Sequence, residues 1–306
     1  MLHSLRPWLV LLPFFTLGCG SSPTTDVVAT TGLIADAAKR IAGPHLSVAC
    51  LMGPGVDPHK YQPPAGDLGK IASARLVLFN GLHLEGKMVE VLEKGGNGRK
   101  AVAVTRALDQ KSDLRKADVD GSGEHDPHVW FDVSLWMKCV EVIRDELCEL
   151  DPPHADEFRA NAAAYLKDLG DLHAEVKRKA DALPKEKRVL ITSHDAFGYF
   201  GAAYGFEVHG LQGVSTAAQS GTQDVQALAA LIGERKVPAV FTESSVPPQG
   251  LKAVLDAVAA KYKANVKLIG DDDALYSDAL GPPGSPGETY LGMVRHNIDV
   301  IVKALK

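Results

Sequence analysis

The sequence predicts an α/β protein with two small parallel-sheet domains joined by one long rigid helix. Three observations support this fold class. Short apolar runs alternate with amphipathic stretches from Asp26 onward, a second such series begins at Arg188, and the segment between them has the pattern of one helix. This alternation is typical of parallel sheets covered by helices on both faces. A chain of 306 residues, 45% of them hydrophobic, is long enough for two domains.

Residues 1–19 have the pattern of an export signal. Arg6 precedes an apolar run over 8–17, and this run is shorter than a bilayer-spanning helix requires. The "TLGC" that closes it resembles a bacterial lipoprotein cleavage box with Cys19 as the lipidated residue, although Thr16 replaces the usual leucine. We expect a protein outside the cytoplasmic membrane, anchored through Cys19, with residues 20–25 as a polar tether. An ordinary cleaved signal peptide is the alternative.

The first α/β domain is predicted to cover residues 26–151. Its strands are expected where apolar runs are short, and its helices where apolar residues recur every three or four positions. The predicted strands are 26–32, 46–52, 75–81 and 100–105, and the predicted helices are 33–42, 65–74, 84–94 and 134–150.

Residues 152–184 are predicted to link the domains as one helix. No proline or helix-ending glycine signal interrupts the segment from His154 to Leu183, which would be roughly 40 Å long. Gly170 is its single weak point. A flexible hinge would favour glycine, serine or short loops, so we expect little movement between the domains.

The second α/β domain is predicted to cover residues 185–306. Apolar runs at 188–193, 207–213, 238–244 and 266–271 predict its strands, and 289–305 predicts a closing helix.

Composition excludes several classes of function. The formal net charge of -5 offers no basic surface for nucleic acid. Three cysteines remain after Cys19, an odd number that does not form a disulfide scaffold. The sequence contains no G-x-x-x-x-G-K-[ST] phosphate loop, so ATP is not expected to be hydrolysed by this chain.

The tripeptide Asp-Pro-His occurs twice, ending at His59 and at His128. Asp-Pro also opens ordinary turns, and a single histidine is more often a hydrogen-bonded structural residue than a ligand. However, His59 and His194 each follow a predicted strand, and Asp278 lies in a loop after a third. His128 lies in the loop before the closing helix of the first half. Because ligands bind beyond the carboxyl ends of parallel strands, these four side chains are expected to converge in a cleft between the domains.

Three imidazoles and one carboxylate are a suitable tetrahedral ligand set for zinc. The proline before each of two histidines stiffens the backbone at a ligand, and the aspartates before the prolines are candidates to hold the ligands from outside. These aspartates are Asp57 and Asp126, and the further outer candidates are Asp195, next to His194, and Glu243, which follows a predicted strand end. Neutral imidazoles are required for binding, so affinity should fall below about pH 6.

Several ordered segments resemble the metal-binding solute-binding proteins of bacterial ABC importers for zinc and manganese. They are "DPHKYQP", "NGLHLEGKM", "DPHVWFD", "SHDAFGYFGAAYGFEV", "GLQGVST" and "LYSDALGPPGSPGETYLGMVRHN", and together they span nearly the whole mature chain. The resemblance implies two α/β domains with one rigid helix and a metal ion between them.

The resemblance also implies metal ligands and partners. The family's ligands correspond to His59, His128, His194 and Asp278. Histidine at position 194 favours Zn²⁺, since members known for manganese often have glutamate there. However, the histidine-rich loop of many zinc members is absent from this sequence, so Mn²⁺ stays the alternative. A monomeric receptor would deliver the ion to a membrane permease with a separate ATPase. His83, Trp130 and Trp136 are expected to be structural.

Two other functions fit a metal cluster in an exported protein. A secreted zinc hydrolase would keep one coordination position open for water, with Glu243 as a nearby base, whereas four protein ligands close that position. A metal-stabilised adhesin would unfold without its ion, whereas a receptor that exchanges metal must remain folded in its metal-free form. We expect a receptor rather than an enzyme.

Overall fold

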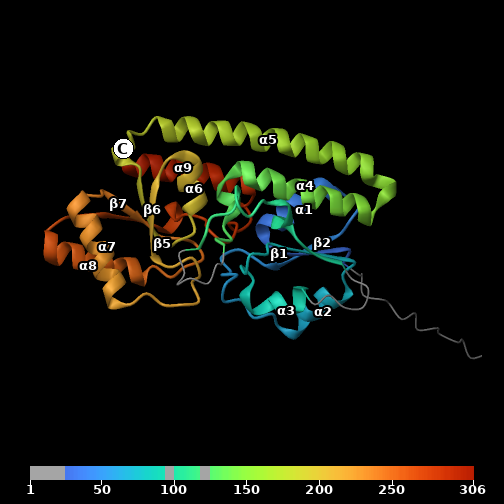
Figure 1. The fold of residues 1–306 in the computed structure, drawn as a ribbon, viewed down its shortest axis with the longest axis horizontal. Coiled ribbons are helices and arrows are strands. Elements are labelled where there is room, and N and C mark those ends of the chain that lie inside the picture. The colour runs from blue at the N-terminus through green and yellow to red at the C-terminus, as the bar shows by residue number, and fades with distance from the viewer. Residues whose placement is uncertain (1–24, 94–99, 118–124) are drawn as a thin grey trace, which may run out of the picture.

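The computed structural model describes residues 25–93, 100–117 and 125–306. In these ranges the chain forms two four-stranded sheets, one in each half, with long helices that run above both (Figure 1). The predicted export signal, Cys19 and residues 20–24 of the tether lie outside the described residues. Within the described ranges, no helix combines the length and the apolar character needed to cross a membrane.

The first sheet has the strand order β2-β1-β3-β4, and all its strands are parallel. Its strands are β1 (Val27–Thr31), β2 (Val48–Met52), β3 (Leu76–Phe79) and β4 (Lys100–Ala103). Helices α1 (Gly32–Ala42) and α4 (Val133–Leu150) lie on one face, and α2 (Ala65–Ser73) and α3 (Val89–Glu93) lie on the other (Figure 1). The predicted strand and helix positions of this half are confirmed within a few residues.

The second sheet repeats this topology with the order β6-β5-β7-β8. Its strands are β5 (Val189–His194), β6 (Glu207–Gln212), β7 (Ala239–Phe241) and β8 (Lys267–Ile269), and its helices are α6 (Gly198–Tyr204), α7 (Thr222–Arg235), α8 (Gln249–Tyr262) and α9 (Tyr290–Leu305). The two halves therefore share one strand order, although their sequences show no clear repeat.

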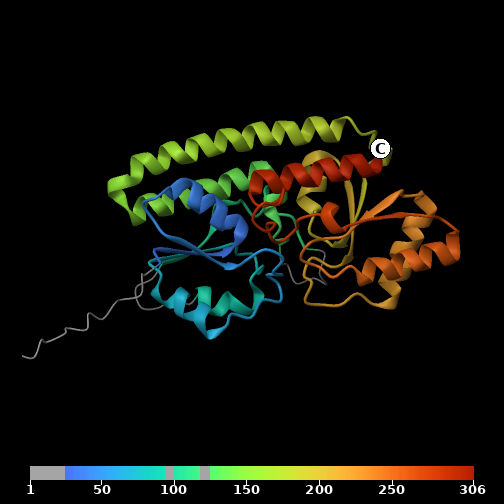
Figure 2. The same ribbon diagram turned by 180° about the vertical axis from the view of Figure 1, so that it is seen from behind.

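The linking helix α5 covers Ala155–Asp181, 27 residues after a short turn at Pro152–His154. It extends over both halves, with α9 and α4 beneath it (Figures 1 and 2). Phe158, Leu169 and Val176 are fully buried along its lower face, so apolar burial fixes the helix along its length. The predicted continuous linker is confirmed.

The two halves share part of their core. One cluster of buried apolar side chains includes Val27 and Leu78 of the first sheet together with Leu190 and Phe241 of the second. Helix α9, at the end of the second half, also reaches the first half, because the Tyr290 hydroxyl donates to the carbonyl of Trp130 at 2.7 Å. Shared burial of this kind limits independent movement of the halves.

Candidate metal centre

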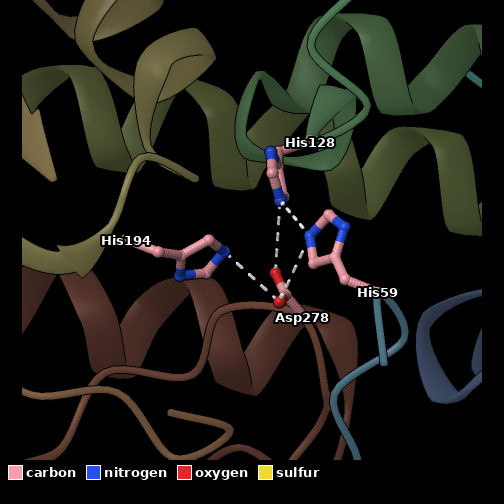
Figure 3. Close-up of side chains that lie close together, drawn as sticks. All are labelled: His59, His128, His194 and Asp278. Carbon is pink, nitrogen blue, oxygen red and sulfur yellow. Dashed lines mark hydrogen bonds and ion pairs between the residues drawn. The ribbon is translucent and has the colours of Figure 1, made fainter. Parts of the chain in front are cut away.

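Four side chains from four separate segments meet between the two sheets (Figure 3). His59 lies in the loop after β2, His128 precedes the turn Val129–Phe131, His194 is the last residue of β5, and Asp278 lies in the loop between β8 and α9. One nitrogen or oxygen of each lies within 4.8 Å of the others. The exposed fractions are 6% for His59, 0% for His128 and His194, and 2% for Asp278.

The distances between donor atoms match a tetrahedral metal site. Bonds of about 2.1 Å to a central ion place neighbouring donors about 3.4 Å apart. The Nε2 atoms of His59 and His128 are 3.2 Å apart, and His128 Nε2 is 3.5 Å from Asp278 Oδ1. The Nε2 atoms of His194 and His59 lie 3.3 Å and 3.8 Å from Asp278 Oδ2. A dication such as zinc fits between these four groups.

Several atoms of the cluster are buried without a hydrogen-bond partner. Both carboxylate oxygens of Asp278 and the Nε2 of His194 are in this state within the described chain. Burial of unsatisfied polar atoms is unfavourable. A bound cation would satisfy all three atoms at once, so the residues present fit a metal ion.

The pKa shifts of the clustered side chains favour binding of a cation. Burial alone would raise the pKa of the Asp278 carboxyl, but the nearby imidazoles, His194 first, hold it well below its usual range. Burial lowers the pKa of His59 to about 4, which keeps this imidazole neutral at neutral pH. Burial opposes protonation of His194 too, but Glu243 and Asp278 raise its pKa well above the ordinary value. The metal must therefore displace a proton from His194.

Two of the imidazoles hydrogen-bond to carboxylates that are not among the four clustered side chains. Asp126 Oδ1 accepts the ring Nδ1–H of His128 at 2.8 Å, and Glu243 Oε2 accepts the ring Nδ1–H of His194 at 2.5 Å. Glu243 Oε1 also accepts the backbone N–H of His194 at 2.9 Å. These bonds place a proton on each Nδ1 and orient each Nε2 toward the cluster, and such outer contacts strengthen metal binding.

The two Asp-Pro-His segments have the same local geometry. Asp57 Oδ1 accepts the backbone N–H of His59 at 3.0 Å, and Asp126 Oδ1 accepts that of His128 at 2.9 Å. Only the second aspartate also reaches the imidazole of its histidine. Asp195 makes no hydrogen bond to an imidazole of the described chain, and burial together with Asp126 raises its pKa.

Sequence reasoning missed the residues that support the His128 loop. Asn80 donates from Nδ2 to the carbonyl of Pro127 at 3.1 Å, and the buried Glu85 accepts the Asn80 backbone N–H at 2.7 Å. Both belong to the segment "NGLHLEGKM", in which the conspicuous residue, His83, is exposed. The indole of Trp130 donates to the carbonyl of Ser277 at 3.1 Å and so joins the His128 and Asp278 loops.

A glycine permits the backbone arrangement at the end of β5. A Cβ at Gly210 of β6 would lie 2.5 Å from the His194 carbonyl carbon and 2.3 Å from the Asp195 nitrogen. A side chain at this position would therefore displace the strand end that carries His194.

Residues 27–304 match the family model described as "Zinc-uptake complex component A periplasmic". The chain is similar to the zinc-binding protein TroA of Treponema pallidum, with 50% identity over 97% of this chain and 96% of the relative. A solved structure of periplasmic zinc binding protein TroA superimposes with a TM-score of 0.86 and 49% identity, covering 91% of this chain and 98% of that one.

Relatives described as manganese-binding are similar too. The manganese-binding lipoprotein MntA of Bacillus subtilis is 45% identical over 100% of both chains. The manganese ABC transporter substrate-binding lipoprotein PsaA of Streptococcus anginosus is 29% identical over 93% of this chain and 90% of the relative. The similarity therefore extends over the whole described fold, with both metals named among the relatives.

Proposed function

Because the chain belongs to the family of periplasmic zinc-uptake components, we propose that it is an extracytoplasmic receptor that binds one divalent metal ion and delivers it to an ABC-type permease for import. The convergence of three imidazoles and one carboxylate, with buried atoms that lack any other partner, is the observation that carries this proposal. The ion is the cargo of the protein, and the protein catalyses no reaction on it.

The proposed ligands are His59, His128, His194 and Asp278. Three nitrogens and a carboxylate oxygen favour Zn²⁺ by ligand type, with Mn²⁺ as the alternative cargo. The similarity to a zinc-binding relative and to a manganese-binding relative supports both ions as candidates.

The contacts of Glu243 favour a receptor over a hydrolase. A hydrolase needs an open metal position and a carboxylate free to activate water. Here both Glu243 oxygens bind the backbone and the ring of His194, and four protein groups surround the metal position. Membership of an uptake family likewise favours a receptor over an adhesin.

We further propose a monomer, tethered by a lipid on Cys19, that meets a membrane permease driven by a separate ATPase. Relatives described as lipoproteins and as an ABC transporter component support this arrangement. The division into residues 1–19, 20–25, 26–151, 152–184 and 185–306 stays a prediction.

Metal titration tests the function directly. We expect metal-stripped protein to bind one Zn²⁺ or Mn²⁺ per chain in isothermal titration calorimetry, and His128→Ala to lose this binding. His154→Ala is the matched control, because His154 also pairs with an aspartate at 2.8 Å but has a 42% exposed side chain away from the cluster. Absence of binding of either metal to the unmodified protein would refute the proposal.

A further inference from the structure

The backbone just before Asp278 pairs with the chain that follows β7. The Leu275 N–H donates to the Thr242 carbonyl at 2.9 Å, and the Leu275 carbonyl accepts the Ser244 N–H at 2.9 Å. These bonds place Leu275 beside Glu243, whose carboxylate accepts the ring N–H of a clustered histidine. The approach to the carboxylate ligand is therefore fixed on one side by the segment that supports another ligand.

The next residue, Tyr276, is held by the side-chain amide of Asn297 in α9. Asn297 Oδ1 accepts the Tyr276 backbone N–H at 3.0 Å, and Asn297 Nδ2 donates to the Tyr276 carbonyl at 2.7 Å. Asn297 is 2% exposed. This amide thus pairs with both backbone groups of one residue, as a neighbouring strand would. Without it, a buried N–H and a buried carbonyl would lose their partners, which is unfavourable.

The Tyr276 ring in turn supports the far end of the loop that carries Asp278. A Cβ at Gly281 would lie 2.8 Å from Cε1 of the ring, and a Cβ at Gly287 would lie 2.3 Å from Cε2. Both glycines therefore pack their backbones against the ring, and the Gly281 N–H donates to the Gly287 carbonyl at 2.8 Å. The position of Asp278 thus depends on Tyr276, and the backbone of Tyr276 is fixed by Asn297.

This loop presents both oxygens of Asp278 to the three imidazoles (Figure 3). Oδ1 lies 3.5 Å from His128 Nε2, whereas Oδ2 lies 3.3 Å and 3.8 Å from the Nε2 atoms of His194 and His59. Zn²⁺ is bound well by imidazole and accepts three histidines with water in the fourth position. Mn²⁺ prefers carboxylate oxygens and binds a given site more weakly. Binding of Mn²⁺ should therefore depend more strongly on the position of Asp278.

We propose that Asn297 is a positioning residue that sets the choice of metal, because by fixing Asp278 it allows the site to hold Mn²⁺ as well as Zn²⁺. The inference rests on the proposed function, since it concerns the cargo of the same site. Asn297 acts through the backbone of Tyr276, two residues before the ligand. Loss of its amide leaves the three imidazoles in place and loosens the carboxylate, so the site keeps zinc better than manganese.

The affinities of two variants for both ions test this proposal. Asn297→Ala removes both hydrogen bonds, and Asn297→Asp keeps the acceptor for the Tyr276 N–H while an oxygen replaces the donor to its carbonyl. Metal-stripped protein is titrated with Zn²⁺ and with Mn²⁺ in competition with a chelator. In Asn297→Ala we expect the affinity for Mn²⁺ to fall about a hundredfold and that for Zn²⁺ about tenfold, the two ends of the range for residues that orient metal ligands. Asn297→Asp should shift the ratio in the same direction and serves if the alanine variant does not fold.

Asn161→Ala is the matched control, because Asn161 Nδ2 donates to the Ile41 carbonyl at 3.0 Å and joins α5 to α1 in the first half. It removes a similar amide–carbonyl bond, so both affinities should stay unchanged, and the melting temperatures of the metal-free variants report the structural cost of each change.

A lower melting temperature of the Asn297 variants with an unchanged ratio of the two affinities would show a structural role alone and overturn the proposal. An equal shift of the ratio in Asn161→Ala, or Zn²⁺ binding without any Mn²⁺ binding by the unmodified protein, also overturns it while the receptor function stands. Failure of the unmodified protein to bind either ion overturns the function itself.

Discussion

Replacement of Asp126 by asparagine should weaken metal binding without disturbing the fold. One oxygen, Asp126 Oδ1, accepts both the backbone N–H of His128 at 2.9 Å and its ring Nδ1–H at 2.8 Å. An asparagine carbonyl can accept the same two bonds, so Asp126→Asn removes mainly the negative charge, and Asp126→Ala removes the bonds as well. Hydrogen bonds to charged groups contribute about 1.5–3 kcal/mol, and about 1.4 kcal/mol corresponds to tenfold in affinity.

We therefore expect zinc affinity to fall about tenfold in Asp126→Asn and about a hundredfold in Asp126→Ala, the range found for groups that orient metal ligands. Chelator-competition titration at neutral pH measures both values. Asp151→Asn is the matched control, because Asp151 Oδ2 pairs with His154 Nδ1 at the same 2.8 Å on the surface. Equal affinities of Asp126→Asn and the unmodified protein would show that the carboxylate does not tune His128.

Three further results are expected. First, removal of the metal by a chelator should lower the melting temperature in calorimetry but leave a folded protein, since metal at 100 times its Kd adds about 2.7 kcal/mol of stability. Unfolding of the metal-stripped protein would contradict this expectation. Second, zinc affinity should rise from pH 5 to pH 8. The raised pKa of His194 keeps a proton there that the metal must displace, and this proton becomes easier to remove as pH rises. Titration in buffers of different ionisation enthalpy should detect the released proton, and a pH-independent affinity would contradict the assignment. Third, Gly210→Ala should destabilise the protein by about 1–3 kcal/mol in denaturant titration, because its Cβ would overlap the end of β5. Gly170→Ala in the middle of α5, where a Cβ meets nothing within 4 Å, should instead stabilise it by about 0.5–1 kcal/mol; the reverse order would contradict the packing argument.

Local patterns predicted much of the fold and of the cluster. The continuous helix α5 follows from a long stretch without proline, and the placement of His59 and His194 follows from the ends of parallel strands. The sequence makes both Asp195 and Glu243 candidates to hydrogen-bond a metal ligand. β5 ends at His194, so Asp195 already lies in the following loop and makes no hydrogen bond to an imidazole of the described chain. Glu243 follows β7, the strand paired with β5, and reaches the ring.

Contacts between distant segments had no local signal. The Trp130–Ser277 bond joins residues 147 positions apart, and the Thr216–Asp57 bond joins residues 159 apart. Both depend on how the two halves pack against each other, which hydrophobic periodicity does not encode. The Asn80–Pro127 bond, which supports the His128 loop within the first half, likewise joins residues that are 47 positions apart.

The buried row along α5 has a thermodynamic consequence for cargo binding. A swing of one half against the other would expose Phe158, Leu169 and Val176 to water, so folding itself already holds the two halves of the site together. The entropy of assembling ligands from four segments is lost when the chain folds, before any ion arrives. Metal binding then needs little additional ordering and buries little new apolar surface, so the preorganised site should bind its ion with a small change in heat capacity.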